Sequence, residues 1–193
     1  MTMGKPIKPS THLFNGLNLM NSRPMITEKI ALTLAGCVFY GDPIGSHGAG
    51  STENEIGRLC ERFMRLSKEH REQLNSVTVE EGVAWEAHIQ SEKSDEPNEY
   101  TVFVGIEVNE PPPIPLGFFY KALPGTRYTV FTLKAEEFTI GLDWIYSEWL
   151  PSSKYHESHT YMLWRYDMET FRGFEDSDSV IQAYIPVEEN ADG

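Results

Sequence analysis

Two strand-like runs, residues 83–90 and 160–167, carry side chains that could bind or act on a small molecule. Glu86 and His88 alternate in the first run, and Trp164 and Tyr166 alternate in the second. Alternate residues of a strand point to the same side of a sheet, so each pair is expected to share a face. A carboxylate among aromatic rings attracts cations, and a carboxylate beside His or Tyr can transfer protons. The alternatives are a solvent-exposed Glu86 and aromatic rings that belong to an ordinary core.

Five further aromatic residues are candidates for the same site. Tyr40 ends an apolar strand beside a Gly-rich loop. Trp144 lies off the apolar stripe of a predicted helix, which leaves it either exposed or facing a cleft. The full predicted ligand-binding set is Tyr40, Trp85, Glu86, His88, Phe103, Trp144, Trp164, Tyr166 and Tyr184. If the protein is an enzyme, Glu86, His88 and Tyr166 are the predicted catalytic residues.

The residue types present exclude several kinds of cofactor and metal site. The loop 45–50, GSHGAG, contains no Lys and does not match the phosphate-binding pattern GxxxxGK[ST]. His156 and His159 have only Glu157 beside them, and the two cysteines form no CxxC pair, so no metal site is predicted. Cys37 and Cys60 lie in apolar segments and are expected to be buried, reduced thiols. No cofactor is predicted.

Composition narrows the class of protein further. The chain has 193 residues, 40% of them hydrophobic, which suits one soluble domain. A formal net charge of -13 disfavours direct binding to nucleic-acid phosphates. No apolar run approaches the ~20 residues of a membrane helix, and the N-terminus lacks a signal-peptide pattern. A cytoplasmic protein that contacts no membrane is therefore expected.

The predicted elements follow the order strand, helix, strand, strand twice. A Pro-rich linker at 110–115 separates two repeats, which span about 30–108 and 118–187. A Thr52–Glu55 capping box is expected to start the first helix, and Pro151 to stop the second. The expected strands are 26–40, 83–90, 100–108, two runs in 118–134 around Pro124-Gly125, 160–167 and 180–187; the expected helices are 53–73 and 136–150.

This order indicates an α+β fold in which two pseudo-symmetric β-α-β-β repeats, with antiparallel sheets, form a central ligand cleft. Ligand sites favour such internal interfaces. Glu86 in the first repeat corresponds to Trp164 in the second, so the two are expected to meet in the cleft. Residues 1–25 are expected to be an irregular leader, 26–188 the domain, and 189–193 an acidic tail.

Four stretches of the second half, LPGTRYTVF, IYSEWLPSSKY, LWRYD and AYIPV, closely resemble the GyrI-like family. This family is also known as the bacterial transcription-activator effector-binding domain, and it includes ligand domains of AraC/Rob-type and MerR-type multidrug regulators. The first half is similar more loosely, through EKIALTLAGCVFYGD and Gly105 in FVGIEV. The resemblance covers about residues 26–188. No helix-turn-helix segment precedes it, which implies a stand-alone effector-binding protein.

The resemblance implies a protein that binds hydrophobic or aromatic, often cationic, small molecules between its two halves. The family's usual Glu positions fall here at Trp164 and Gln182, so Glu86 is the candidate replacement. Two alternative functions stay open. Some stand-alone relatives hydrolyse cyclopropane-bearing compounds, and one family member inhibits DNA gyrase, which would imply a protein partner for this chain.

Overall fold

The structure is a computed structural model that describes residues 24–43, 51–90, 99–109 and 117–190. Within these residues it is an α+β fold with an eight-stranded antiparallel sheet, which confirms the predicted fold class. The strands are β1 (Met25–Ile26), β2 (Ile30–Gly41), β3 (Val83–Gln90), β4 (Tyr100–Glu107), β5 (Phe119–Lys134), β6 (Tyr155–Glu157), β7 (Tyr161–Asp167) and β8 (Val180–Glu189). The helical segments are α1 (Glu55–Glu69), α2 (Arg71–Asn75), the 3-10 turn η2 (Ala135–Glu137), α3 (Phe138–Trp144), the π-helical turn η3 (Ile145–Trp149) and α4 (Leu150–Ser152).

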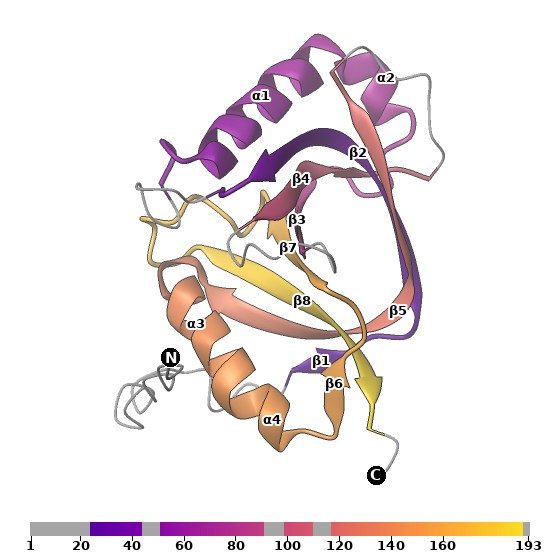
Figure 1. Cartoon of the computed structure of the whole chain (residues 1–193). Coiled ribbons are helices and arrows are strands. Elements are labelled where there is room, and N and C mark those ends of the chain that lie inside the picture. Colours follow the sequence, from indigo (N-terminus) through magenta and orange to yellow (C-terminus); the bar gives the residue numbers. More distant parts are fainter. Residues whose placement is uncertain (1–23, 44–50, 91–98, 110–116, 191–193) are drawn as a thin grey trace, which may run out of the picture.

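The strand order β1-β5-β2-β4-β3-β7-β8-β6 places the two repeats side by side in one sheet. β2, β4 and β3 come from the first repeat, and β7, β8 and β5 from the second. The repeats meet where β3 pairs with β7, and Glu86 lies directly opposite Trp164. β5 pairs with both β2 and β8, so the sheet closes into a ring (Figure 1). This closure holds the β3–β7 seam, and the residues on it, in a fixed position.

The Pro124-Gly125 pair does not form the predicted turn between two strands. Residues 119–134 form one continuous strand of 16 residues. Between the pairs Leu32–Leu123 and Ile30–Thr126, β5 has one residue more than β2, which is a β-bulge. Pro has no N–H group, and a bulge is one of the few places in a sheet that tolerates this loss. The bulge lies just before β5 changes its partner from β2 to β8, so one strand serves both repeats.

The two helical runs pack on the same, outer face of the ring. α1 begins at Asn54, whose side chain accepts a hydrogen bond from the Gly57 N–H group, and not at the predicted Thr52–Glu55 box. The second run continues to Ser152, one residue past Pro151. α1 buries Leu59, Phe63 and Leu66 over β2 and β4, and the second run packs over Phe131, Ile181 and Ile185 of β5 and β8. Figure 1 shows α1 and α3 at opposite ends of this face, with β3 and β7 between them.

The inner face of the ring is filled by a separate apolar core. Trp85 and Tyr184 meet edge to face there, with ring centroids 5.0 Å apart. The hydroxyl groups of Tyr128 and Tyr161 are hydrogen-bonded at 2.9 Å in the same core. Other members are Leu32, Leu34, Ala87, Phe103, Leu123, Val130 and Leu163. Because neighbouring residues of a strand face opposite sides, these side chains point away from the helices.

A candidate ligand-binding cleft between the two repeats

A cleft of about 2240 Å³ lies on the outer face, between α1 and α3, with β3 and β7 as its floor. It runs the length of the seam, from Val83 and Met168 at one end to Gln90 and Thr160 at the other. Eight residues of extended strand span roughly 24 Å at about 3.4 Å each. The cleft is therefore larger than the ~300–1,000 Å³ of an ordinary drug-sized pocket.

Glu86 lies at the centre of the cleft floor and is 5% exposed. Its Oε1 atom is hydrogen-bonded to His88 Nε2, and its Oε2 atom accepts a hydrogen bond from the Tyr166 hydroxyl at 3.0 Å. The β3–β7 register brings these groups together, since it sets Glu86 opposite Trp164 and Ala84 opposite Tyr166. Burial, and then the charge of Glu86, raise the pKa of Tyr166 well above its ordinary value, so this hydroxyl stays a donor.

An aromatic wall closes the second-repeat side of the cleft. Trp164 meets Phe138 of α3 edge to face at 5.9 Å, and Tyr166 meets Phe171 at 4.8 Å. Phe174 completes the wall, 5.1 Å from Phe138 and 5.3 Å from Phe171 between ring centroids. Phe138, Phe171 and Phe174 are not among the residues predicted for the site from the sequence. Phe171 and Phe174 lie in an acidic, aperiodic segment, METFRGFEDSDS, where the only signal was two aromatic residues three positions apart.

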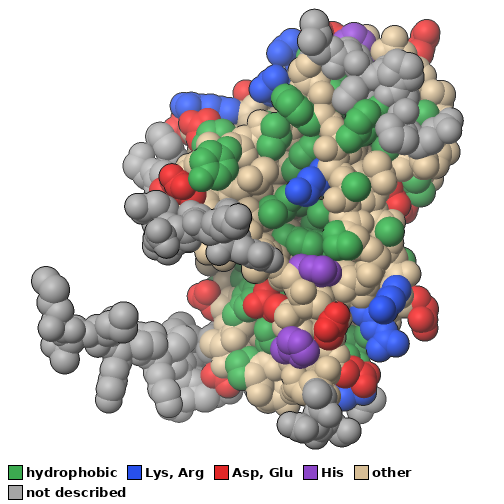
Figure 2. Space-filling model, turned by 45° about the vertical axis from the view of Figure 1, so that its right-hand side comes forward, with side chains coloured by type: hydrophobic (Ala, Val, Ile, Leu, Met, Phe, Trp, Pro, Cys, Tyr) green, Lys and Arg blue, Asp and Glu red, His purple; other side chains and the backbone are tan. Residues whose placement is uncertain are grey.

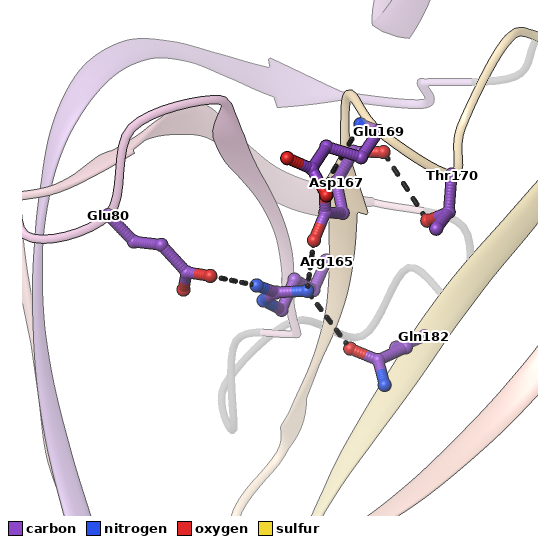
Figure 3. A network of polar contacts seen from close by, with 6 residues as sticks. All are labelled: Glu80, Arg165, Asp167, Glu169, Thr170 and Gln182. Atoms are coloured by element: carbon purple, nitrogen blue, oxygen red, sulfur yellow. Dashed lines mark hydrogen bonds and ion pairs between the residues drawn. The ribbon is translucent and has the colours of Figure 1, made fainter.

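The segment that carries Phe171 and Phe174 is held by a polar network centred on Arg165, which does not line the cleft (Figure 3). Arg165 donates to Glu80 at 2.5 Å, to Gln182 at 3.2 Å and to Asp167 at 3.3 Å. Asp167 then organises the following turn: its side chain accepts from the Glu169 N–H group, and its carbonyl accepts from the Phe171 N–H group at 2.7 Å. Arg165 therefore connects Glu80 of the first repeat to the wall of the second.

The first-repeat side of the cleft is formed by α1 and by β4. Ile56, Cys60 and Met64 line it from α1, and Tyr100 and Val104 from β4. Burial, and then the negative charge of Glu86, raise the pKa of Cys60 to about 12. The thiol therefore stays neutral beside the carboxylate at ordinary pH.

The lining of the cleft is strongly acidic. It includes nine Asp or Glu residues and three Lys or Arg residues, a ratio above the 29 to 16 of the whole chain. By contrast, the face of the molecule in Figure 2 has acidic and basic side chains intermixed. The acidic lining residues are Asp42, Glu61, Glu80, Glu81, Glu86, Asp143, Glu157, Glu175 and Asp176, and the basic ones are Lys68, Arg71 and Arg172. This excess of negative charge favours a positively charged guest.

The structure brings four of the nine predicted site residues together in the cleft, namely Glu86, His88, Trp164 and Tyr166. It places the other five elsewhere. Trp85, Phe103 and Tyr184 lie in the inner core, one position out of phase with the cleft-facing residues of their strands. Trp144 packs on Phe131 under the helix, at 6.2 Å between ring centroids. Tyr40 is 60% exposed, donates to Glu99 and is not among the residues that line the cleft.

Of the possible metal ligands predicted from the sequence, Glu157 and His159 line the cleft, and His156 does not. Most of the Gly-rich loop, residues 44–50, lies outside the described residues. Across the described ranges, no group of three or more His, Cys, Asp and Glu side chains is arranged to hold a metal ion. Across the same ranges, no helix is long and apolar enough to cross a membrane.

Comparison with known proteins identifies the family. The family described as Cass2, integron-associated effector binding protein, matches residues 25–187. The chain belongs to this family. It is an effector-binding family related to transcription regulators, so a small-molecule-binding protein is indicated, and the resemblance to GyrI-like domains is confirmed. No curated protein matches the chain in sequence.

Solved structures with the same fold include a protein bound to a ligand, a stand-alone cassette protein and a C-terminal domain. SAV2435 bound to tetraphenylphosphonium aligns with a TM-score of 0.56 and 10% identity, over 86% of this chain and 94% of that one. An integron cassette protein from the Vibrio cholerae mobile metagenome aligns with a TM-score of 0.55 and 14% identity, over 86% and 95% of the two chains. The EcmrR C-terminal domain aligns with a TM-score of 0.58 and 12% identity, over 87% and 98%. At these identities the likeness establishes the fold.

Proposed function

We propose that this Cass2-family protein binds hydrophobic aromatic cations in the cleft, and that Glu86 selects the positive charge. The observation that carries the proposal is a carboxylate that is 5% exposed, set among aromatic rings, whose hydrogen-bond partners among the described residues are His88 and Tyr166. Burying a charged carboxylate without a Lys or Arg partner costs desolvation free energy, and a cation bound beside it would offset that cost.

Two features of the cleft and one relative support a cationic, aromatic guest. Trp164 and the phenylalanines of the wall offer flat apolar area and cation–π attraction. The acidic lining draws cations into the cleft before contact is made. SAV2435, which shares the fold, was solved bound to tetraphenylphosphonium, a cation of this class.

The test compares a cation with a neutral molecule of similar shape. Methyltriphenylphosphonium and triphenylphosphine oxide are titrated calorimetrically into the wild-type protein and into Glu86→Gln. The wild type should bind the cation at least ~10-fold more tightly than the neutral molecule, a difference of about 1.4 kcal/mol in binding free energy. Glu86→Gln should remove that preference and change the affinity for the neutral molecule by less than about 2-fold. Glu188→Gln, which changes the net charge equally outside the cleft lining, is the matched control. An unchanged cation preference in Glu86→Gln would refute the proposal.

The hydrogen bonds of Glu86 also favour a second candidate function, a hydrolase acting in the same cleft. Glu86 could accept a proton from water while the Tyr166 hydroxyl or His88 supplies one to the opening substrate. Mass spectrometry of a cyclopropane-bearing aromatic compound after incubation tests this. A product heavier by one water, lost in Glu86→Gln and in Tyr166→Phe, supports the hydrolase. Recovery of the compound unchanged with the wild type supports the binder.

A further inference from the structure

The cleft contains a second carboxylate–tyrosine pair in addition to Glu86 and Tyr166. Glu157 of β6 and Tyr146 of η3 both line the cleft, and the Tyr146 hydroxyl is hydrogen-bonded to the Glu157 carboxylate. Both side chains reach solvent, and Tyr146 is 37% exposed. This second pair therefore lies at the open mouth of the cleft, whereas Glu86 lies at its buried centre.

Two local features place this outer pair. Tyr146 belongs to a π-helical turn, a wider turn that is often found at functional sites. Glu157 belongs to the short strand β6, where Tyr155 on the same face stacks against Trp149 at 6.4 Å between ring centroids. The helical run and β6 are thus packed together by one aromatic contact beside the pair. Partial burial disfavours the charged form of the Glu157 carboxyl and raises its pKa, and a bound cation would offset that cost.

Three polar aromatic side chains, His88, Tyr100 and Tyr146, line the cleft between the two carboxylates. His88 is hydrogen-bonded to Glu86, and its ring lies 6.2 Å from that of Tyr100. Tyr100 lies near Tyr146, the partner of Glu157. In the β3–β4 ladder Tyr100 lies opposite Gln90. Gln90 is four residues from Glu86 along β3, a distance of roughly 14 Å in an extended strand. Glu157 is three residues before Thr160, which is hydrogen-bonded to Gln90, so the two carboxylates lie towards different parts of one groove.

We propose that the cleft has two cation subsites, an inner one at Glu86 and an outer one at Glu157, and that its preferred ligands are elongated aromatic dications. This inference rests on the proposed function and extends it to a class of ligand. A cleft of about 2240 Å³ has room for a molecule longer than one aromatic cation. A linker that spans both carboxylates makes the second contact intramolecular, which raises affinity without any new kind of contact.

The experiment uses bis-benzamidines, in which two benzamidinium groups are joined by flexible ether linkers of increasing length, and para-butoxybenzamidine as the one-charge half-molecule. Affinities are measured by calorimetry for the wild type, Glu157→Gln, Glu86→Gln and Glu188→Gln. The amide of Glu157→Gln keeps an acceptor for Tyr146 and removes only the charge. Glu188 lies opposite His156 in the β6–β8 ladder, and His156 is next to Glu157 in sequence. Glu188 is therefore near Glu157 but outside the cleft lining, which makes Glu188→Gln the matched control. Melting curves verify that each variant is folded.

The expected result is that the best bis-benzamidine binds the wild type at least ~10-fold more tightly than para-butoxybenzamidine. Glu157→Gln should lower the affinity for the dication to that of the half-molecule. Its affinity for the half-molecule should stay within about 2-fold of the wild-type value. Glu86→Gln should weaken both, and Glu188→Gln neither. If Glu86→Gln weakens both probes but Glu157→Gln affects neither, or affects both equally, the outer subsite is refuted and the proposed function stands. If Glu86→Gln leaves the half-molecule unaffected, the proposed function itself fails.

Discussion

At the scale of single residues, the central carboxylate changes the chemistry of its neighbours. Tyr166 and Cys60 both lie beside Glu86, and burial together with this negative charge raises the pKa of each. The phenol and the thiol therefore stay protonated at ordinary pH. Cys60 lines the cleft, so its reactivity reports on the site directly.

Cys60 should react slowly with iodoacetamide, because the thiolate is the reactive form and a pKa of about 12 leaves little of it at pH 8. We expect alkylation at least ~100-fold slower than in the unfolded chain, rising about tenfold per pH unit below the pKa. Glu86→Gln should speed the reaction, since it removes one cause of the raised pKa. Peptide mass spectrometry separates Cys60 from Cys37. Equal rates in the folded and unfolded protein would contradict this account.

At the scale of elements, β7 has different functions on its two faces. Trp164 and Tyr166 face the cleft, and Arg165, between them in sequence, points to the network behind it. Arg165 and Asp167 hold the turn that follows β7, and this turn presents Phe171 to Tyr166. The aromatic wall is thus positioned from the opposite side of the sheet.

Arg165→Met should weaken ligand binding even though Arg165 does not line the cleft. The change removes the hydrogen bonds that Arg165 donates to Glu80, Asp167 and Gln182, so the turn loosens and Phe171 loses its fixed position. We expect a several-fold loss of affinity for methyltriphenylphosphonium and a loss of about 2–4 kcal/mol in unfolding free energy by urea titration. Arg127→Met, which removes an exposed ion pair with Glu189, is the control and should change neither. Unchanged affinity in Arg165→Met would show that the wall is positioned without this network.

At the scale of the whole molecule, the ring makes the two repeats depend on each other. The β3–β7 seam joins them on one side, and β5 joins them again by pairing with β2 and β8. A cleft floored by two strands from different repeats keeps its geometry only while both repeats are folded. We therefore expect the described region to unfold as one cooperative unit.

Phe131→Ala tests whether the two repeats unfold cooperatively. Phe131 is 2% exposed and contacts both Trp144 and Trp149. Its truncation should cost about 3–5 kcal/mol and lower the melting temperature by about 10 °C. Circular dichroism and tryptophan fluorescence, which includes Trp85 of the first repeat, should still report the same midpoint. Two separate transitions would show that the repeats fold independently.

Much of the central site could be predicted from the sequence, because strand alternation is a local property. The spacing of Glu86 with His88, and of Trp164 with Tyr166, sufficed to predict a shared face for each pair, and the repeated element order brought the pairs together. The same alternation could have excluded Trp85, which directly precedes Glu86 and must face the other way. The predicted ligand-binding set nevertheless included Trp85 beside Glu86.

Sequence by itself determined the α+β class, the two repeats and the alternating faces of the strands, since these follow from short-range periodicity and chain geometry. Only the tertiary structure decided that β5 is one bulged strand shared by both repeats, because its pairing with β2 and β8 is a long-range choice. Likewise, only the structure brought Phe171 and Phe174 to the wall, and Tyr146 and Glu157 to the mouth. A loop and a short edge strand have no periodicity, so their positions depend on the contacts they make after the sheet has closed.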